Sequence, residues 1–438
     1  MAAGEGDETY MDTCRREHPV LHRLAHRRLW RYFSRDYPSS RARFRAAARR
    51  RGLRLVRREV PNSFGLDLTV DIAVRPGTRG WVLHLAGTRG VDGYVGAAVQ
   101  QVLLRHLRML VPADIGLVLV HCVNPFGMAM GRLVNENNVD LEHNAMSDRE
   151  FEARIRARRR WNPAYGKVDH IVNPTGGGGE PPGCGTSLSG ALRSLWHWRL
   201  RGGPTTYEDI QDRGQHWRSD GLAFGGFELQ ASCRHVLDIL GHPAVRPMLG
   251  LPAAVLASAV GASAHGEDTL WAPARHQAAA MRGTAQHPRV EVLPARRRNL
   301  LRRLARRLPR CAMAVHQVHS TQASRFRVLQ HLRDENRQYH HRLHRDCVRY
   351  EMRAGGASAA AVDWERVVEA SEDAEPSLHL GRRDHEPSAG LAQCLGRRRC
   401  DLRELFALGE EQWRERAALR GVLLVLQAAA RVREVAAR

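Results

Sequence analysis

Lysine is almost absent from this sequence of 438 residues. Lys167 is the only lysine, so arginine carries nearly all of the positive charge behind a formal net charge of +22. Proteins selected for contacts with phosphate ordinarily use both residues. The composition therefore favours the arginine and alanine bias of a GC-rich genome, and a polyanionic partner is the alternative.

The sequence also lacks the patterns of exported and membrane-spanning proteins. No opening segment combines a basic stretch, an apolar run and a small-residue cleavage site. The longest apolar runs, at 251–264 and 421–430, are too short to cross a bilayer and predict a buried strand and a core-facing helix. We therefore expect a cytoplasmic protein without membrane contact. There the eight cysteines stay reduced, and none forms the C-x-x-C pair of a cysteine zinc site.

Strand and helix patterns alternate along the chain, which predicts an α/β fold. The strand 66–74 alternates apolar and polar residues, so we expect it to be half-buried. The apolar runs 81–86 and 116–123 predict strands covered on both faces, joined through a helix at 95–110 as a right-handed parallel crossover. The remaining predicted elements are a helix at 41–51, strands at 53–60, 253–260 and 311–318, and a helix at 402–435.

We expect one domain over residues 1–345. Within it the glycine- and proline-rich stretch 174–190 predicts a flexible loop, and no Gly-Lys-Ser/Thr follows to make it a nucleotide-phosphate loop. Residues 346–400 have little periodicity and predict an insertion or mobile loop. Residues 401–438 predict a C-terminal helix that packs on the same domain.

Three stretches carry a family resemblance. They are "YFSRDYPSSRARFRAAARRRGLRL" (32–55), "HLAGTRGVDGYVGAAVQ" (84–100) and "HCVNPFGMAMGRLVNENNVDLEHNA" (121–145). Together they resemble the zinc carboxypeptidase-like superfamily, closest to an uncharacterised, mainly bacterial branch of unknown function. The resemblance implies a three-layer α/β/α domain with a mixed, mainly parallel sheet.

The resemblance also implies a metal site, and this chain departs from it at each position. The family's turn reads Gly-Thr-His-Gly-x-Glu-Gly, so Arg89 takes the place of the histidine ligand and Asp92 that of the glutamate. A second histidine position corresponds to Ala257. Arginine does not give up its proton to become a ligand. A guanidinium ~4 Å from a dication costs roughly 8 kcal/mol at an effective dielectric of ~20. We expect an Arg89–Asp92 ion pair to neutralise the turn without metal.

The substrate and catalytic positions are degenerate as well. Where the family has an Asn-Arg pair that grips a substrate carboxylate, this chain has Glu142 and His143. The family's general-base glutamate position corresponds to Val318 or His319. These departures predict a pseudoenzyme with no metal and no cofactor, which binds an unknown ligand or protein in the former cleft.

Two other functions stay open. An active zinc hydrolase of a peptide or amide bond is the first alternative. In that case His143, His265 and Asp92 would form a relocated metal site. A basic protein associated with nucleic acid is the second, because residues 295–310 form an amphipathic arginine-rich helix that could bind a polyanion weakly. The simpler interpretation of that helix is that its leucines pack on the sheet. His340, His344 and Cys347 lie at helical spacing, and we expect a solvated helix face there rather than a metal site.

Overall fold

The structure is a computed structural model that describes residues 24, 28–62, 65–91, 93–173, 213–262, 268–273, 299–308, 311–319, 325–340 and 411–437. Asp92, His265, His344 and Cys347 lie outside these residues. So do the predicted loop at 174–190 and the predicted insertion at 346–400.

The described residues form one seven-stranded sheet in the order β1-β2-β4-β3-β5-β7-β6. Strands β1, β4, β3, β5 and β7 run in one direction, and β2 and β6 run in the other. The predicted α/β class with a mixed, mainly parallel sheet is therefore confirmed. The strands are β1 (Arg54–Glu59), β2 (Thr69–Arg75), β3 (Gly80–Leu85), β4 (Ile115–Val120), β5 (Ala254–Ala262), β6 (Asp268–Pro273) and β7 (Cys311–His319).

The central strands follow from their apolar runs. Every residue of β3 and of β4 is buried, as strands covered on both faces require. The two strands pair in parallel, with Leu83 opposite Val118, and α4 (Gly93–Arg105) connects them. The predicted crossover is confirmed. Its helix ends earlier than predicted, because the chain breaks at His106 and resumes as α5 (Leu107–Leu110).

The prediction of a half-buried strand at 66–74 was wrong. All residues of β2 are buried except the last, which is partly exposed. The polar face of this strand is covered by α3 (Tyr37–Arg50), whose Arg45 forms an ion pair with Asp71 at 2.9 Å. The Tyr37 hydroxyl accepts a hydrogen bond from the Thr69 backbone N–H at 2.9 Å. Polar partners on a helix thus allow a polar strand face to be buried.

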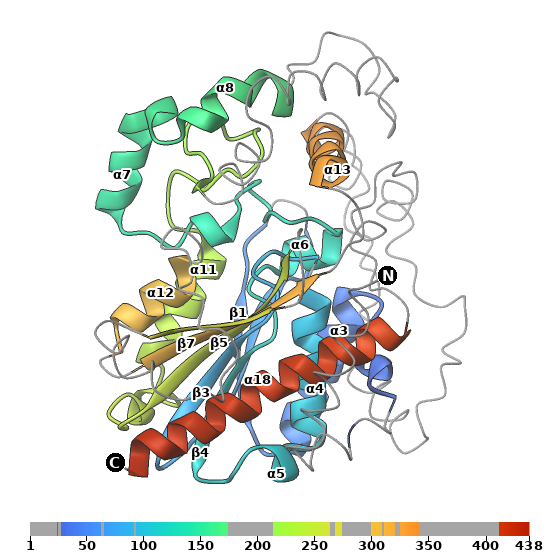
Figure 1. Cartoon of the computed structure of the whole chain (residues 1–438), viewed down its shortest axis with the longest axis vertical. Helices are drawn as coiled ribbons and strands as arrows, with labels where there is room; N and C mark the ends of the chain where they lie inside the picture. The colour runs from blue at the N-terminus through green and yellow to red at the C-terminus, as the bar shows by residue number, and fades with distance from the viewer. Residues whose placement is uncertain are drawn as a thin grey trace.

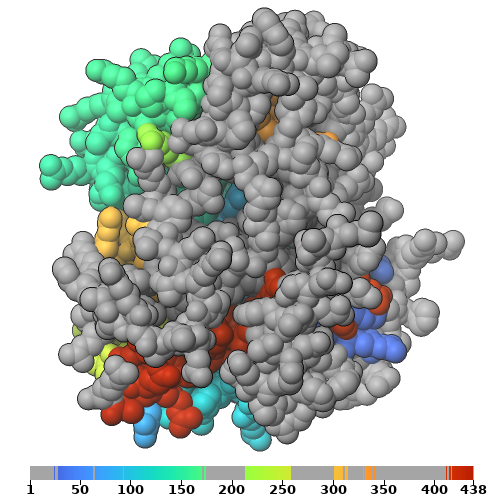
Figure 2. Space-filling view, viewed as in Figure 1, coloured from blue at the N-terminus to red at the C-terminus, as the bar shows by residue number. Residues whose placement is uncertain are grey.

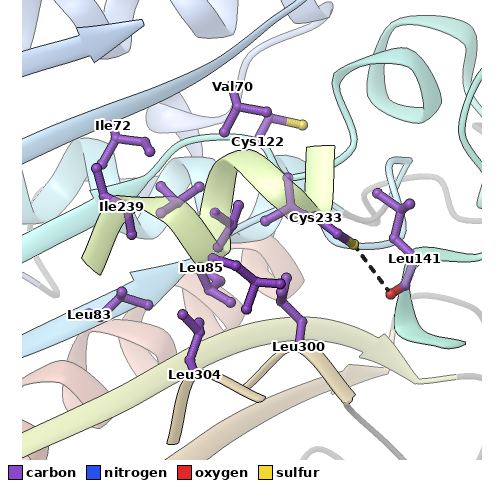
Figure 3. Close-up of a cluster of buried hydrophobic side chains, with 14 of the residues drawn as sticks. Val70, Ile72, Leu83, Leu85, Cys122, Leu141, Cys233, Ile239, Leu300 and Leu304 are labelled. Carbon is purple, nitrogen blue, oxygen red and sulfur yellow. Dashed lines mark hydrogen bonds between the residues drawn. The ribbon is translucent and has the colours of Figure 1, made fainter. Parts of the chain in front are cut away.

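Helices cover both faces of the sheet (Figure 1). One face carries α3, α4 and the long C-terminal helix α18 (Glu411–Ala437), which contacts α4, β3 and β5. The other face carries α11 (Ala231–Asp238) and α12 (Asn299–Arg306). Figure 3 shows the core between the sheet and the face with α11 and α12, where Leu83 and Leu85 of β3 meet Leu300 and Leu304 of α12.

The simpler interpretation of the basic helix at 295–310 agrees with its packing. Leu300, Leu301, Leu304 and Leu308 are at most 5% exposed, which places the apolar side of α12 in the core. The arginine side remains toward the surface, with Arg306 and Arg307 exposed. Packing on the sheet therefore explains the leucines but not the arginines.

Two buried histidines, His84 and His121, have hydrogen-bond partners in the core. Gln100 Nε2 of α4 lies 3.1 Å from His84 Nδ1, and Ser40 Oγ lies 2.9 Å from His121 Nε2. Burial lowers the pKa of His84 to about 4. Burial, assisted by the guanidinium groups of Arg41 and Arg45, lowers the pKa of His121 to about 3. Both rings are therefore neutral in the folded protein at pH 7.

The remaining helices gather beyond one end of the sheet, at the top of Figure 1. They are α6 (Pro125–Met130), α7 (Asp148–Ala157), α8 (Pro163–Val172) and α13 (Arg325–Gln338). Short 3-10 turns lie at η1 (Leu29–Tyr32), η2 (Leu141–His143), η3 (Arg158–Arg160), η4 (Ile239–Gly241) and η5 (Arg246–Met248). In the part of the chain that is described, no helix is long and apolar enough to cross a membrane.

Candidate functional site

The turn that follows β3 is fixed by glycines. Gly87 and Gly90 have φ angles of +68° and +70°, in the left-handed region where a side chain is strained. A Cβ atom at Gly90 would also collide with the carbonyl oxygen of Arg132 and lie 2.5 Å from Cα of Gly127. The Val91 N–H donates to that same Arg132 carbonyl at 3.0 Å. The glycines therefore let this turn lie directly against the segment after α6.

That second segment is held by asparagine side chains. Asn124 begins α6 by accepting a hydrogen bond from the Gly127 N–H at 2.8 Å. Asn135 Oδ1 accepts from the N–H groups of Asn137 and Val139 at 3.1 and 2.8 Å. Asn138 has a φ of +58°, which asparagine tolerates better than most residues. Local side-chain bonds thus replace regular structure over residues 131–140.

Residues 213–230 wrap around this loop and attach it by backbone groups. Asn138 Nδ2 donates to the carbonyls of Ser219 and Gly221 at 2.9 and 3.2 Å. The Asp140 N–H donates to the Phe224 carbonyl at 2.7 Å. His216, which is fully buried, lies with Nδ1 2.8 Å from the Gly226 carbonyl oxygen, and burial lowers its pKa to about 3.

Arg132 lies at the centre of the site and is completely buried. Its Nε donates to Glu335 of α13 at 2.7 Å, and its Nη2 donates to Asn138 Oδ1 at 3.1 Å. Its Cζ atom lies 3.4 Å from the ring centroid of Tyr339, a cation–π contact. Its Nη1 is buried and has no hydrogen-bond partner within the described residues. One nitrogen donor of this buried guanidinium group therefore lacks an acceptor in the described part of the chain.

A pocket of about 410 Å³, counted with its open mouth, lies against Arg132. Four segments line it: the turn after β3 through Arg89, residues 132–140, residues 221–223, and α13 through Leu332, Glu335 and Asn336. It lies beyond the carboxyl end of β3, where ligand sites of open α/β sheets are commonly found. The lining combines two guanidinium groups, two carboxylates and two side-chain amides with a few apolar residues.

Of the two predicted metal-ligand positions that the structure describes, Arg89 lines this pocket and Ala257 does not. The side chain of Ala257 is completely buried in the opposite core, the one formed with α4 and α18. Ala257 pairs with His84 in the sheet. Because successive side chains along a strand point to opposite faces, Ala257 lies on the face that α4 and α18 cover. Asp92 lies outside the described residues, and the expected Arg89–Asp92 ion pair stays a prediction.

The other predicted positions lie elsewhere. Glu142 and His143 form η2, which Asp140 caps by accepting from the Glu142 N–H at 3.0 Å. The His143 ring is buried against Gly214, and its Nε2 lies 3.8 Å from Asp140 Oδ2. Neither residue lines the pocket. Val318 and His319 end β7, opposite Gly261 and Ala262 of β5.

A dication does not fit the described part of the site. Arg89 offers a permanent positive charge, and alanine at position 257 offers no donor atom. No group of three histidine, cysteine, aspartate or glutamate side chains converges anywhere among the described residues. The described residues around the pocket therefore do not make a ligand set for a dication.

Glu136 is a carboxyl group that the sequence did not single out. It is 9% exposed, and its Oε2 is buried with no hydrogen-bond partner among the described residues. Burial raises the pKa of this carboxyl to about 7. Tyr339 donates its hydroxyl to the Glu136 backbone carbonyl at 3.2 Å, so the segment that follows α13 contacts the loop here too.

Arg132 and its partners were also missed, although "NPFGMAMGRLVNENN" was read as a motif. Glu335 is 203 residues away in the sequence, so no local pattern connects the two. The available signal was weak: "RDENRQY" places an acid and an amide next to each other, about one helical turn before an aromatic residue.

A family model described as "Protein of unknown function (DUF2817)" matches residues 33–355. All residues that line the pocket fall inside this match, whereas α18 follows it. No curated protein and no solved structure matches the chain.

Proposed function

The chain belongs to the DUF2817 family, and we propose that this member binds a small ligand with a carboxylate or phosphate group in the pocket beside Arg89, without catalysing a reaction on it. The observation that carries the proposal is the buried Nη1 of Arg132, which has no acceptor in the described part of the chain. A buried donor without a partner costs about 1–3 kcal/mol, and more when it is charged. A ligand oxygen at this position would remove that cost.

The chemistry of the lining supports an oxyanion. Glu335 balances the charge of Arg132, and Arg89 adds a second guanidinium group to the lining. Arginine presents planar donor pairs that match the two oxygens of a carboxylate or phosphate. The Asp140 carboxylate also lines the pocket and would repel a second negative charge on the ligand. This favours a small ligand with one anionic group.

The resemblance to zinc carboxypeptidases supports the absence of a reaction. In that superfamily the turn after the strand supplies a histidine and a glutamate, and here Arg89 stands in the histidine position. Ala257, in the second histidine position, has no donor atom. A metal-activated water therefore has no support from these positions, and the zinc hydrolase remains the alternative that experiment must refute.

Binding can be measured calorimetrically with N-acetylglycine and inorganic phosphate as probes. We expect millimolar or tighter binding of one of them to the wild type. A charge-assisted hydrogen bond contributes about 1.5–3 kcal/mol, so Arg89→Gln should weaken binding roughly 10- to 100-fold. Arg58→Gln removes an exposed arginine from the edge strand β1 and is the matched control, with unchanged affinity. Equal affinities in all three proteins, or no binding of either probe, would refute the proposal.

A further inference from the structure

One flank of the described part of the chain carries an excess of positive charge. This α7 flank comprises residues 148–169, which form α7, η3 and most of α8. It contains seven arginine or lysine residues and four acidic residues, a net charge of +3 (7 − 4). In Figure 2, α7 and α8 form the upper left corner of the face shown, above α12. Arg149, Arg156, Arg158, Arg159 and Arg160 are exposed.

Acidic neighbours neutralise only part of this charge. Arg156 contacts Glu152 at 3.2 Å, but the two side chains are 80% and 62% exposed, and such pairs contribute at most about 1 kcal/mol. Arg159 contacts Asp169 at 3.2 Å. Within the described ranges, three exposed arginines have no acidic partner: Arg149, Arg158 and Arg160.

Arg158 occupies a backbone conformation that disfavours a side chain. Its φ and ψ angles are 47° and −129°, a combination that glycine adopts readily and arginine does not. Such conformations cost about 1–3 kcal/mol and are common at binding sites. An arginine here weakens the fold, and it places three consecutive exposed guanidinium groups, Arg158 to Arg160, at the end of α7.

The arginine side of α12 continues this surface. Arg306 lies 3.6 Å from Glu150 of α7, which links the two helices. Arg302 and Arg306 lie one turn apart, as do Arg303 and Arg307, so like charges repel along the helix. Burial and then the Arg306 guanidinium lower the pKa of Arg302. An anionic partner would relieve this repulsion.

We propose that the α7 flank binds the phosphate backbone of a nucleic acid. Guanidinium groups recognise phosphates through paired donors, and the formal charge of +22 attracts a polyanion over long range. The core of a protein interface and a helix inserted in a membrane surface ordinarily include exposed apolar groups as well. Among the described residues the exposed large hydrophobic side chains are Met109 and Phe227, and both lie outside the flank.

The test is fluorescence anisotropy of a labelled random-sequence DNA duplex with the full chain over a series of salt concentrations. The double variant Arg158→Gly/Arg160→Gln should bind more weakly and reduce the slope of log K against log salt by about 2, one for each lost phosphate contact. Its unfolding midpoint in urea should not fall, because glycine removes the strain at position 158.

The matched control is Arg54→Gln/Arg58→Gln, which removes two exposed charges from β1 and should leave the salt slope unchanged. An equal loss of slope in this control would show that the net charge, and not the flank, binds DNA. Absence of wild-type binding at physiological salt would overturn the proposal. So would binding to phosphatidylserine vesicles without binding to the duplex.

Discussion

Replacing Glu335 by leucine leaves the guanidinium of Arg132 buried without its carboxylate. Arg132 is completely buried and the Glu335 side chain is 10% exposed, so neither charge is well solvated. Removal of one partner of a buried ion pair costs about 3–5 kcal/mol. Native domains are stable by only about 5–15 kcal/mol, so the loss is a large part of the total. We expect a loss of unfolding free energy in the same range for Arg132→Met, which leaves the Glu335 carboxylate buried without its guanidinium.

The double variant Arg132→Met/Glu335→Leu separates the pair from its surroundings. Replacing both charges with apolar side chains of similar size is often neutral or stabilising, so the double variant should be more stable than either single variant. Urea unfolding followed by circular dichroism gives the four free energies. The reasoning would be refuted if each single variant lost less than about 1 kcal/mol of unfolding free energy and the loss in the double variant equalled the sum of the two. An ion pair with these values behaves like one on the protein surface.

Two further predictions concern pH and the glycine turn. His84, His121 and His216 have pKa values below the ordinary 6.5, so in the unfolded chain these three groups bind about three more protons between about pH 4.5 and 6.5. Glu136, with its raised pKa, binds one more proton in the folded state. These four groups together lower the unfolding free energy by about 3 kcal/mol for each pH unit of acidification, and a flat or opposite dependence in urea titrations would contradict them. Gly90→Ala should destabilise the protein more than Gly52→Ala, because both residues have φ near +70° but only Gly90 has backbone atoms in the way. Equal losses in thermal unfolding would refute the close contact with Arg132.

The central part of the fold follows from the sequence because its signals are local. Continuous apolar runs predicted β3 and β4, and the helical period between them predicted the crossover. The edge strand β6 was missed, because a six-residue segment ending in Pro273 has no distinctive pattern. The burial of the polar face of β2 was also missed. It depends on Arg45, which reaches Asp71 from a helix 26 residues earlier.

The site was less predictable, because its residues meet only in the folded chain. The turn with Arg89 was found through the family resemblance of residues 84–100, in which Gly87 and Gly90 have the positive φ angles. Arg132 and Glu335 left no trace in the sequence, because a long-range ion pair has no periodicity. Ala257 illustrates a different limit: a shift of one residue along a strand changes the face on which the side chain lies.

The most direct test follows N-acetylglycine by proton NMR in a solution of the untagged wild-type protein with added zinc. We predict that the acetyl methyl signal broadens as the pocket binds the carboxylate, and that no acetate signal grows over time. A growing acetate signal that stops when a chelator is added would contradict the account.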